Sequence, residues 1–427
     1  MKNSIIKYII PFLLFLFSCK EDIIENLNNP DYSLSEYLFE MMITEKWYYW
    51  VDEITPVKPK YNENPNEYIN RLRYEKYDKW SYVQNIKTYD AYFSSGTYKG
   101  YGFLLLEHTD GSMRFALIFK NSPMGNQNVK RGYKLLFIDN KSAIDLYNNN
   151  QYNSYINAND SHTFTVEDYD GNISEFTISK REINQETIIA NAIYNINNKK
   201  VGYFVFNSFI RPAYNELNSL FEIFKNEEID ELIIDLRYNG GGSVNIAVFL
   251  GNLIAGLKAN GQVFNTLEFN QYKTENNESD YFSIEENSID INRVFFITTS
   301  GSASASELVI NSVLPFLDVK IIGEPSHGKP VGMRTFRYKD MVAAPITFKT
   351  VNANGNGEYF NGFPVNAITS DGLDKDFGDQ EEACLKNALH YIETGVFLTE
   401  DIDENKKSAL IKKDFPLKGF EWIVGAY

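Results

Sequence analysis

From about residue 200 onward, the chain alternates apolar runs of strand length with longer runs that carry apolar residues at helical spacing. The runs of strand length cover residues 201–206, 232–236, 293–299 and 319–322. The helical runs cover residues 214–224, 246–257 and 307–317. Repeated strand–helix units join parallel strands through right-handed crossovers. The pattern therefore predicts an α/β core built on a mostly parallel sheet.

Length and charge narrow the class of protein further. A chain of 427 residues suggests two or three domains. Asp and Glu number 57 against 41 Lys and Arg, which gives a formal net charge of −16. A surface this acidic repels phosphate groups, so we expect no nucleic-acid partner. With two cysteines and four widely spaced histidines, we expect neither a disulfide framework nor a multi-histidine metal site.

Residues 1–18 have the composition of a secretory signal peptide, because two lysines precede an apolar run that is too short to span a bilayer. The run ends in Leu-Phe-Ser-Cys, which resembles a bacterial lipobox and predicts lipidation of Cys19. The next three residues, Lys-Glu-Asp, resemble the export tag of Bacteroidetes lipoproteins, and residues 19–32 suit a tether. These features predict an outer-membrane lipoprotein displayed at the cell surface, whose only link to the membrane is its lipid. The alternative is an ordinary signal peptide that happens to carry a cysteine.

Residues 33–87 predict a small helical domain. Ser33 and Glu36 form a capping-box signature ahead of apolar residues at helical spacing. A second short helix is expected after the Asn-Pro-Asn at 64–66. The run Trp-Tyr-Tyr-Trp at 47–50 fits either a partner surface or the packing of this domain, and core packing is the simpler interpretation.

Residues 88–183 change to short strands separated by turns. A Gly-Tyr-Gly-Phe segment at 100–103 leads into a strand, and a Ser-Pro pair and a further strand follow, in an order that resembles a PDZ domain. The resemblance implies that backbone N–H groups of Tyr101, Gly102 and Phe103 bind the carboxylate of a peptide C-terminus. The alternative is a β-rich spacer whose glycines only permit a turn.

Three motifs lie where predicted strands of the α/β core end. Residues 235–242 close a strand with three consecutive glycines, whose N–H groups can approach a ligand oxygen, and match neither nucleotide-binding glycine pattern. Residues 299–307 run from a strand through small residues into a helix, a geometry that presents a serine hydroxyl. Residues 323–330 supply two candidate bases, His327 and Lys329. The lysine can act only if burial lowers its pKa toward neutrality.

Together the three motifs resemble those of the C-terminal processing peptidases, also called tail-specific proteases, which use a serine–lysine pair. In the family pattern the lysine follows the middle serine by 25 positions, which implies Ser304 as the nucleophile and Lys329 as the base. The resemblance also implies an oxyanion hole formed by the N–H of Ala305 and that of Gly241 or Gly242. The alternative is that Ser302, Ser304 and Ser306 are simple N-cap and turn residues, since serine favours both positions.

The same resemblance implies the fold class: α/β, with a ClpP/crotonase-like peptidase core over residues 184–400, a PDZ-like β-rich domain and a small N-terminal helical domain. Residues 401–427 would form a C-terminal extension. One position departs from the pattern, because many members place a glutamine four residues after the lysine and this chain has Met333. A thioether is too weak an acceptor to orient an ammonium group.

We therefore expect a lipid-anchored serine endopeptidase that cleaves protein or peptide substrates with accessible C-termini and needs no metal or organic cofactor. Met333 favours an alternative, a weak or inactive surface lipoprotein of the same fold that binds peptides or a small hydrophobic ligand. A second alternative is a scaffold in an outer-membrane complex. Asp235 and Arg237 are expected to form a structural pair, and Glu307 to be a first-turn acid that favours the helix dipole.

Overall fold

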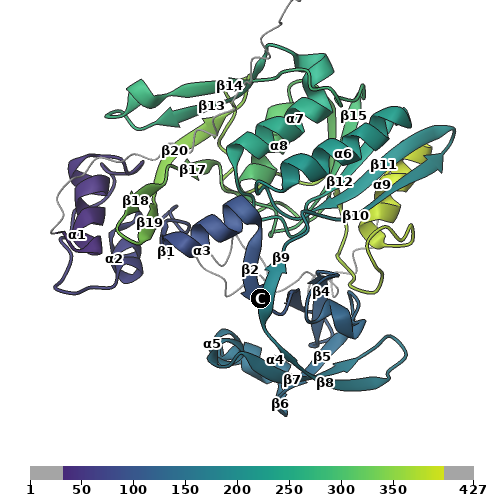
Figure 1. Cartoon of the computed structure of the whole chain (residues 1–427). Helices are drawn as coiled ribbons and strands as arrows, with labels where there is room; N and C mark the ends of the chain where they lie inside the picture. The colour runs from purple at the N-terminus through teal and green to yellow at the C-terminus, as the bar shows by residue number, and fades with distance from the viewer. Residues whose placement is uncertain (1–31, 399–427) are drawn as a thin grey trace, which may run out of the picture.

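The computed structural model describes residues 32–398, and its centre is a six-stranded sheet (Figure 1). In spatial order its strands are β10 (Ile188–Ile196), β11 (Lys199–Phe206), β12 (Glu231–Asp235), β15 (Arg293–Thr298), β16 (Asp318–Gly323) and β21 (Ala367–Ile368). β10 and β11 are antiparallel, and every other neighbouring pair is parallel. The prediction of an α/β core with a mostly parallel sheet is confirmed.

Helices cover both faces of this sheet. The helices on one face are α6 (Ala213–Asn226), α7 (Val244–Ala259) and α8 (Ala305–Val313), and α9 (Ala383–Thr394) covers the other. Side chains alternate along each strand, so that in β11 Phe204 packs with α6 and its neighbours while Tyr203 packs with α9. Burial on both faces is the reason that the central strands β11, β12 and β15 are apolar over most of their length.

Helix α8 is shorter than its apolar pattern predicts. The pattern extends to residue 317, but the helix ends at Val313 with Leu314 as its C-cap. Leu314 still has helical backbone angles, but Pro315 lacks the N–H group that would make the next helical hydrogen bond, which explains the early end. At its other end, α8 begins directly after Ser304.

The N-terminal unit, residues 33–87, packs on a four-stranded sheet of the core and contributes β1 to a second, three-stranded sheet (Figure 1). Its helical segments are α1 (Leu34–Phe39), a π-helical turn (Glu40–Thr44) and α2 (Pro65–Leu72). One sheet contains β14 (Glu278–Tyr281), β13 (Val263–Phe269), β20 (Ile346–Val351) and β17 (Val331–Met333), and the other contains β1 (Tyr82–Asn85), β19 (Met341–Ala344) and β18 (Phe336–Tyr338). The Ser33–Glu36 capping box is present as predicted. Tyr48 and Trp50 lie in a shared core with Ile346, which confirms the core-packing interpretation.

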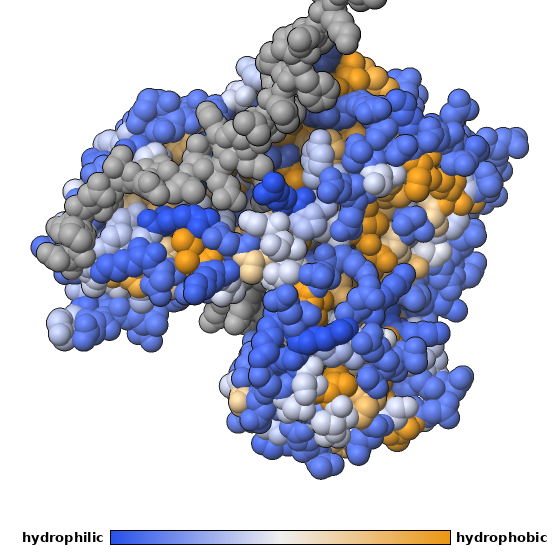
Figure 2. Space-filling model, in the orientation of Figure 1, coloured by the Kyte–Doolittle hydropathy of each residue, from blue (hydrophilic) through white to orange (hydrophobic). Residues whose placement is uncertain are grey.

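The β-rich unit, residues 97–184, is joined to the core by a ribbon of β2 (Thr97–Gly100) and β9 (Arg181–Asn184) (Figure 1). Its sheet has the order β3 (Phe103–Glu107), β4 (Met113–Ile118), β5 (Lys134–Ile138), β7 (Ser161–Glu167) and β8 (Ile173–Ser179), with β6 (Lys141–Ser142) beside β5. Helices α4 (Ala143–Asn148) and α5 (Tyr152–Ala158) pack on it. Figure 2 shows the unit as a separate lobe with a mostly hydrophilic surface.

The predicted signal peptide, Cys19 and most of the tether lie outside the described residues, as does the C-terminal extension. Within residues 32–398, no helix has the length and apolar character needed to cross a membrane.

Candidate active site

Ser304 lies in the tight turn between β15 and α8, as the N-cap residue of α8. Its backbone has φ 56° and ψ −114°, and a positive φ is uncommon for a residue with a side chain. The neighbouring serines are committed to the scaffold: Ser302 Oγ donates to the Leu236 carbonyl at 2.7 Å, and Ser306 Oγ donates to the Asn239 carbonyl at 2.9 Å. Both are fully buried, whereas Ser304 is half-buried. Ser304 is thus the one of the three serines that is only partly buried.

Glu307 connects the serine turn to the lysine loop. Its carboxylate is fully buried and accepts four hydrogen bonds from the two segments. Oε2 accepts the N–H of Ser304 at 3.0 Å and the N–H of Lys329 at 2.8 Å. Oε1 accepts the Ser326 hydroxyl and the Gly328 N–H, both at 2.6 Å. We refer to these five residues as the Glu307 cluster.

The prediction that Glu307 is simply a first-turn helix acid therefore understates its role. Burial raises the pKa of its carboxyl, and the four hydrogen bonds oppose this rise. One oxygen atom accepts the backbone N–H groups of both Ser304 and Lys329, so it fixes the distance between the two backbones. Its Oε2 also completes the reciprocal half of a capping box on the Ser304 N–H.

Lys329 is 5% exposed. Burial lowers the pKa of its ammonium group to about 8, although Asp78 and Glu307 act in the opposite direction. Among residues 32–398, no carboxylate forms an ion pair with Lys329 Nζ. With a pKa near 8, about one-tenth of these side chains are neutral at pH 7, and the fraction rises steeply above it.

His327 is held in one neutral tautomer. Its Nδ1 lies 3.1 Å from the Ser300 carbonyl, to which it donates, and its Nε2 accepts the indole N–H of Trp80 at 3.1 Å. Burial lowers the pKa of the imidazole to about 4. The nitrogen that a base needs is thus occupied by an indole proton, which disfavours a serine–histidine arrangement.

The glycine loop that follows β12 lies against the serine turn. Gly241 has φ +105°, and a Cβ there would lie 2.8 Å from both Ser304 Cβ and the Ala305 nitrogen. The N–H of Gly241 donates to Asn239 Oδ1 at 2.9 Å. Ala305 is the first residue of α8, so its N–H has no acceptor within the helix. Within the pair Gly241 and Gly242, the Asn239 contact favours Gly242 as the second oxyanion donor.

The sequence matches two models of one peptidase family. The model described as peptidase family S41 matches residues 200–365, and the model of the N-terminal domain of the same family matches residues 35–82. Together they cover half of the chain. The chain belongs to peptidase family S41. The motifs at the ends of β12, β15 and β16 all lie within the first match.

Two curated proteins are similar to this chain. The chain is 29% identical over 140 residues to a probable CtpA-like serine protease of Staphylococcus saprophyticus, covering 33% of this chain and 27% of that protein. It is 21% identical over 283 residues to the carboxy-terminal processing protease CtpA of Bacillus subtilis, covering 66% and 58%. The chain therefore spans less than two thirds of either relative.

A solved structure shares the fold. The crystal structure of a putative S41 protease from Bacteroides fragilis superposes with a TM-score of 0.70 at 21% identity, covering 86% of this chain and 99% of that one. This match confirms the predicted combination of a mixed α/β core with a small N-terminal helical region.

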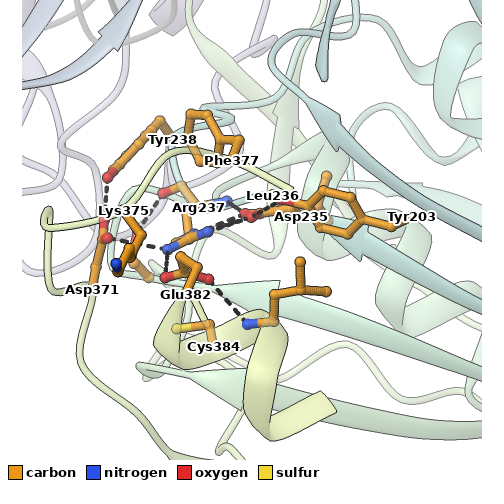
Figure 3. A network of polar contacts seen from close by, with 12 residues as sticks. Tyr203, Asp235, Leu236, Arg237, Tyr238, Asp371, Lys375, Phe377, Glu382 and Cys384 are labelled. Carbon is orange, nitrogen blue, oxygen red and sulfur yellow. Dashed lines mark hydrogen bonds and ion pairs between the residues drawn. The ribbon is translucent and has the colours of Figure 1, made fainter. Parts of the chain in front are cut away.

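Asp235 and Arg237 form the structural pair that the sequence predicts, within a larger network (Figure 3). Arg237 binds Asp235 at 2.6 Å, Glu382 at 2.7 Å and Asp371 at 3.1 Å. Arg131 of the β-rich unit binds the same Asp371 carboxylate. We refer to these five residues as the arginine cluster. Burial alone lowers the pKa of Arg237, but the three carboxylates raise it well above its usual range.

The predicted carboxylate-binding loop lies in the β-rich unit, apart from the serine turn. Tyr101 and Phe103 bury their side chains in that unit, and Gly102 has φ +86°, with Ser122 so close that a Cβ would lie 2.0 Å from its Cβ. Only glycine fits such a position. The loop leads into β3, which is an edge strand of its sheet. Binding of a peptide carboxylate by this loop stays a prediction.

Sequence reasoning missed three residues of the site. The bridging role of Glu307 had a local signal, because Ser304 and Glu307 have the spacing of a capping box. Asp78 and Trp80 had none, since they approach Lys329 from the N-terminal unit, about 250 positions earlier in the chain. Met333 lies in β17 and is partly buried against the core of the N-terminal unit.

Proposed function

We propose that the protein is a serine endopeptidase that uses Ser304 as nucleophile and Lys329 as general base. The observation that carries the proposal is the Glu307 carboxylate, whose Oε2 accepts the N–H groups of both Ser304 and Lys329. The lowered pKa of Lys329, the neutral tautomer of His327 and the scaffold roles of Ser302 and Ser306 support the same assignment.

In this proposal the neutral amine of Lys329 takes the Ser304 hydroxyl proton as Oγ attacks the substrate carbonyl. The N–H groups of Ala305 and Gly242 stabilise the oxyanion of the tetrahedral intermediate. Collapse of the intermediate breaks the peptide bond, and the Lys329 ammonium returns its proton to the leaving amine. Water then hydrolyses the acyl-serine by the same proton route, which restores both residues.

The test combines casein hydrolysis with labelling by a serine-directed phosphonate. Wild-type protein should cleave casein and form an adduct, and Ser304→Ala should do neither. Ser302→Ala and Ser306→Ala serve as matched controls, because they remove buried scaffold hydroxyls and should retain the adduct. An adduct that persists in Ser304→Ala would assign the nucleophile elsewhere.

The second candidate function is a peptide-binding surface lipoprotein without catalysis, and Met333 favours it. In that case wild-type protein would neither cleave casein nor form the adduct, yet would still bind peptides. The two candidates therefore differ in the first measurement.

We propose further that the β-rich unit is PDZ-like and receives substrate C-termini at Tyr101, Gly102 and Phe103. The edge position of β3 supports this, because an added peptide strand needs an unpaired edge. A peptide with a free C-terminal carboxylate should bind Ser304→Ala protein more tightly than its C-terminal amide. Equal affinities would indicate a spacer.

The cellular location is also a proposal. The lipobox-like sequence supports lipidation at Cys19 and an outer-membrane location. Cys19→Ala should release the protein from the membrane fraction or leave its precursor unprocessed, and unchanged membrane association would contradict the anchor.

A further inference from the structure

The amine of Lys329 faces the N-terminal unit. Its Nζ lies over the indole ring of Trp80, 5.7 Å from the ring centroid. This distance is within the range of a cation–π contact, which strengthens when the cation is desolvated. Trp80 is 8% exposed and Lys329 is 5% exposed, so the contact is shielded from water.

The indole ring of Trp80 is fixed from two sides. Its Nε1–H donates to His327 Nε2 at 3.1 Å, and His327 is anchored in turn on the Ser300 carbonyl. At the backbone, the Trp80 N–H donates to Asp78 Oδ1 at 3.0 Å. The ring is thereby tied both to the lysine loop and to its own turn.

Asp78 organises that turn. Its buried carboxylate accepts the Tyr48 hydroxyl at 2.8 Å, together with the backbone N–H of Ser81 at 2.9 Å and the hydroxyl of Ser81 at 2.5 Å. Ser81 Oγ in turn accepts the N–H of Ile346 at 3.0 Å, which attaches the turn to β20 of the core. These hydrogen bonds fix the turn of the N-terminal unit that places Trp80 against Lys329.

We propose that Trp80 is a positioning residue for Lys329. The face of its indole ring attracts the Lys329 side chain when that side chain is an ammonium group. The ring accepts no hydrogen bond from Nζ, so the lone pair of the neutral amine stays available for Ser304. The inference rests on the proposed serine–lysine dyad. A carboxylate or amide oxygen on Nζ would hold its protons by hydrogen bonds, whereas a ring face attracts the cation without accepting a directed bond from it.

The charged and titratable groups around Lys329 are consistent with this role. Asp78, Glu307 and His327 face it, and Lys79 faces His327. The Glu307 carboxylate accepts its four hydrogen bonds from donors other than Lys329 Nζ, and the Asp78 carboxylate accepts hydrogen bonds within its own turn. Met333, four residues after Lys329 in the chain, offers only a thioether, which is a weak acceptor. The ring of Trp80 adds to the Coulomb attraction of Asp78 and Glu307 in stabilising the cation that forms when Ser304 gives up its proton.

The test follows the ionisation of Lys329 directly, by NMR titration of 13Cε-labelled lysine in the full chain carrying Ser304→Ala. The Lys329 signal is assigned by its absence in Lys329→Arg. Trp80→Leu removes both the ring face and the indole N–H that donates to His327, and should lower the titration midpoint of Lys329 by about one pH unit. Trp80→Phe keeps a ring without the N–H and should give a smaller shift. Trp47→Leu removes an indole of the same unit that packs against Phe269 and Phe336 rather than Lys329, and should leave the midpoint unchanged.

An unchanged midpoint in Trp80→Leu would overturn the proposal, as would equal shifts in Trp80→Leu and Trp80→Phe. Because the titration needs no catalysis, its result is independent of the proposed function. If wild-type protein fails to cleave casein while Trp80→Leu still shifts the midpoint, the proposed function fails and the contact stands. If Trp80→Leu does not fold, Trp80→Phe and Trp47→Leu decide the same question. A lowered midpoint in Trp80→Phe alone supports the proposal, and an unchanged midpoint in both variants overturns it.

Discussion

The arginine cluster and the Glu307 cluster are both buried and polar, but they differ in whether their charged groups are paired with opposite charges. The arginine cluster balances two guanidinium groups with three carboxylates, and Arg131 and Arg237 lower the pKa of Asp371 against the effect of burial. The Glu307 cluster has one carboxylate that accepts neutral donors, and its lysine forms no ion pair within the described residues. Residues 235–242 run from one cluster to the other.

The difference separates a structural role from a chemical one. Paired charges in a dry interior cannot easily gain or lose protons, so they fix the geometry of neighbouring chain segments. An unpaired buried amine loses its proton readily, which is what a general base requires. The arginine cluster joins the β-rich unit to the end of β12 and α9, while the Glu307 cluster joins the loop of Lys329 to the serine turn.

The largest effect is expected from Arg237→Met. It leaves three buried carboxylates with one remaining guanidinium, so the free energy of unfolding should fall by about 3–5 kcal/mol. Chemical denaturation of both proteins measures this. Arg131→Met is the matched control, because Asp371 keeps its contact with Arg237, and its loss should be smaller. If Arg131→Met lowers the free energy of unfolding as much as Arg237→Met does, the three carboxylates depend on Arg131 as much as on Arg237.

Glu307→Gln sharpens the comparison at the second cluster. The substitution replaces one carboxylate oxygen by an NH₂ group, which donates hydrogen bonds and cannot accept them. At least one pair of N–H or O–H donors therefore loses its acceptor, and the serine turn and the lysine loop should move apart. We expect hydrolysis of a peptide substrate to fall by about a hundredfold or more, with a loss of stability of about 1–3 kcal/mol. Glu222→Gln, an exposed change on α6, is the control and should alter neither quantity. Wild-type activity in Glu307→Gln would remove the bridge from the mechanism.

Lys329→Met should have opposite effects on activity and stability. Activity should vanish with the base, while the free energy of unfolding at pH 7 should rise by about 1–3 kcal/mol, because no charge remains to be desolvated. The pKa of Lys329 is about 8 in the folded protein and about 10.4 in the unfolded chain, so unfolding takes up a proton between these values. Wild-type stability should therefore rise with pH across this window relative to the variant. Denaturation at pH 7 and pH 10 measures the difference, and a gap that does not narrow would contradict the lowered pKa.

The smallest expected effect is the pH dependence of the wild-type reaction. With a base whose pKa is about 8, kcat/KM should rise about tenfold between pH 7 and pH 9 and then level off. Lys329→Arg should be inactive throughout, since a guanidinium stays protonated. A midpoint near 6.5 would instead point to a histidine base, against the lowered pKa of His327.

Much of this protein is determined locally in its sequence. Apolar periodicity predicted the βα core, and glycine and small-residue motifs predicted where its strands end, because both signals depend on residues a few positions apart. The spacing of Ser33 and Glu36 predicted the first helix cap. Ser304 and Lys329 were identified by motif order, and the structure connects the two segments through Glu307.

Tertiary structure alone decided the environment of those residues. Trp80 meets Lys329, and Arg131 meets Asp371 across 240 positions of the chain. No local pattern encodes such contacts, because they arise only when separately folded segments pack together. The pKa of Lys329 depends on the same packing, since burial removes the water that would stabilise its charge. The sequence thus supplied the amine and its position in the chain, and the fold determined how readily that amine loses its proton.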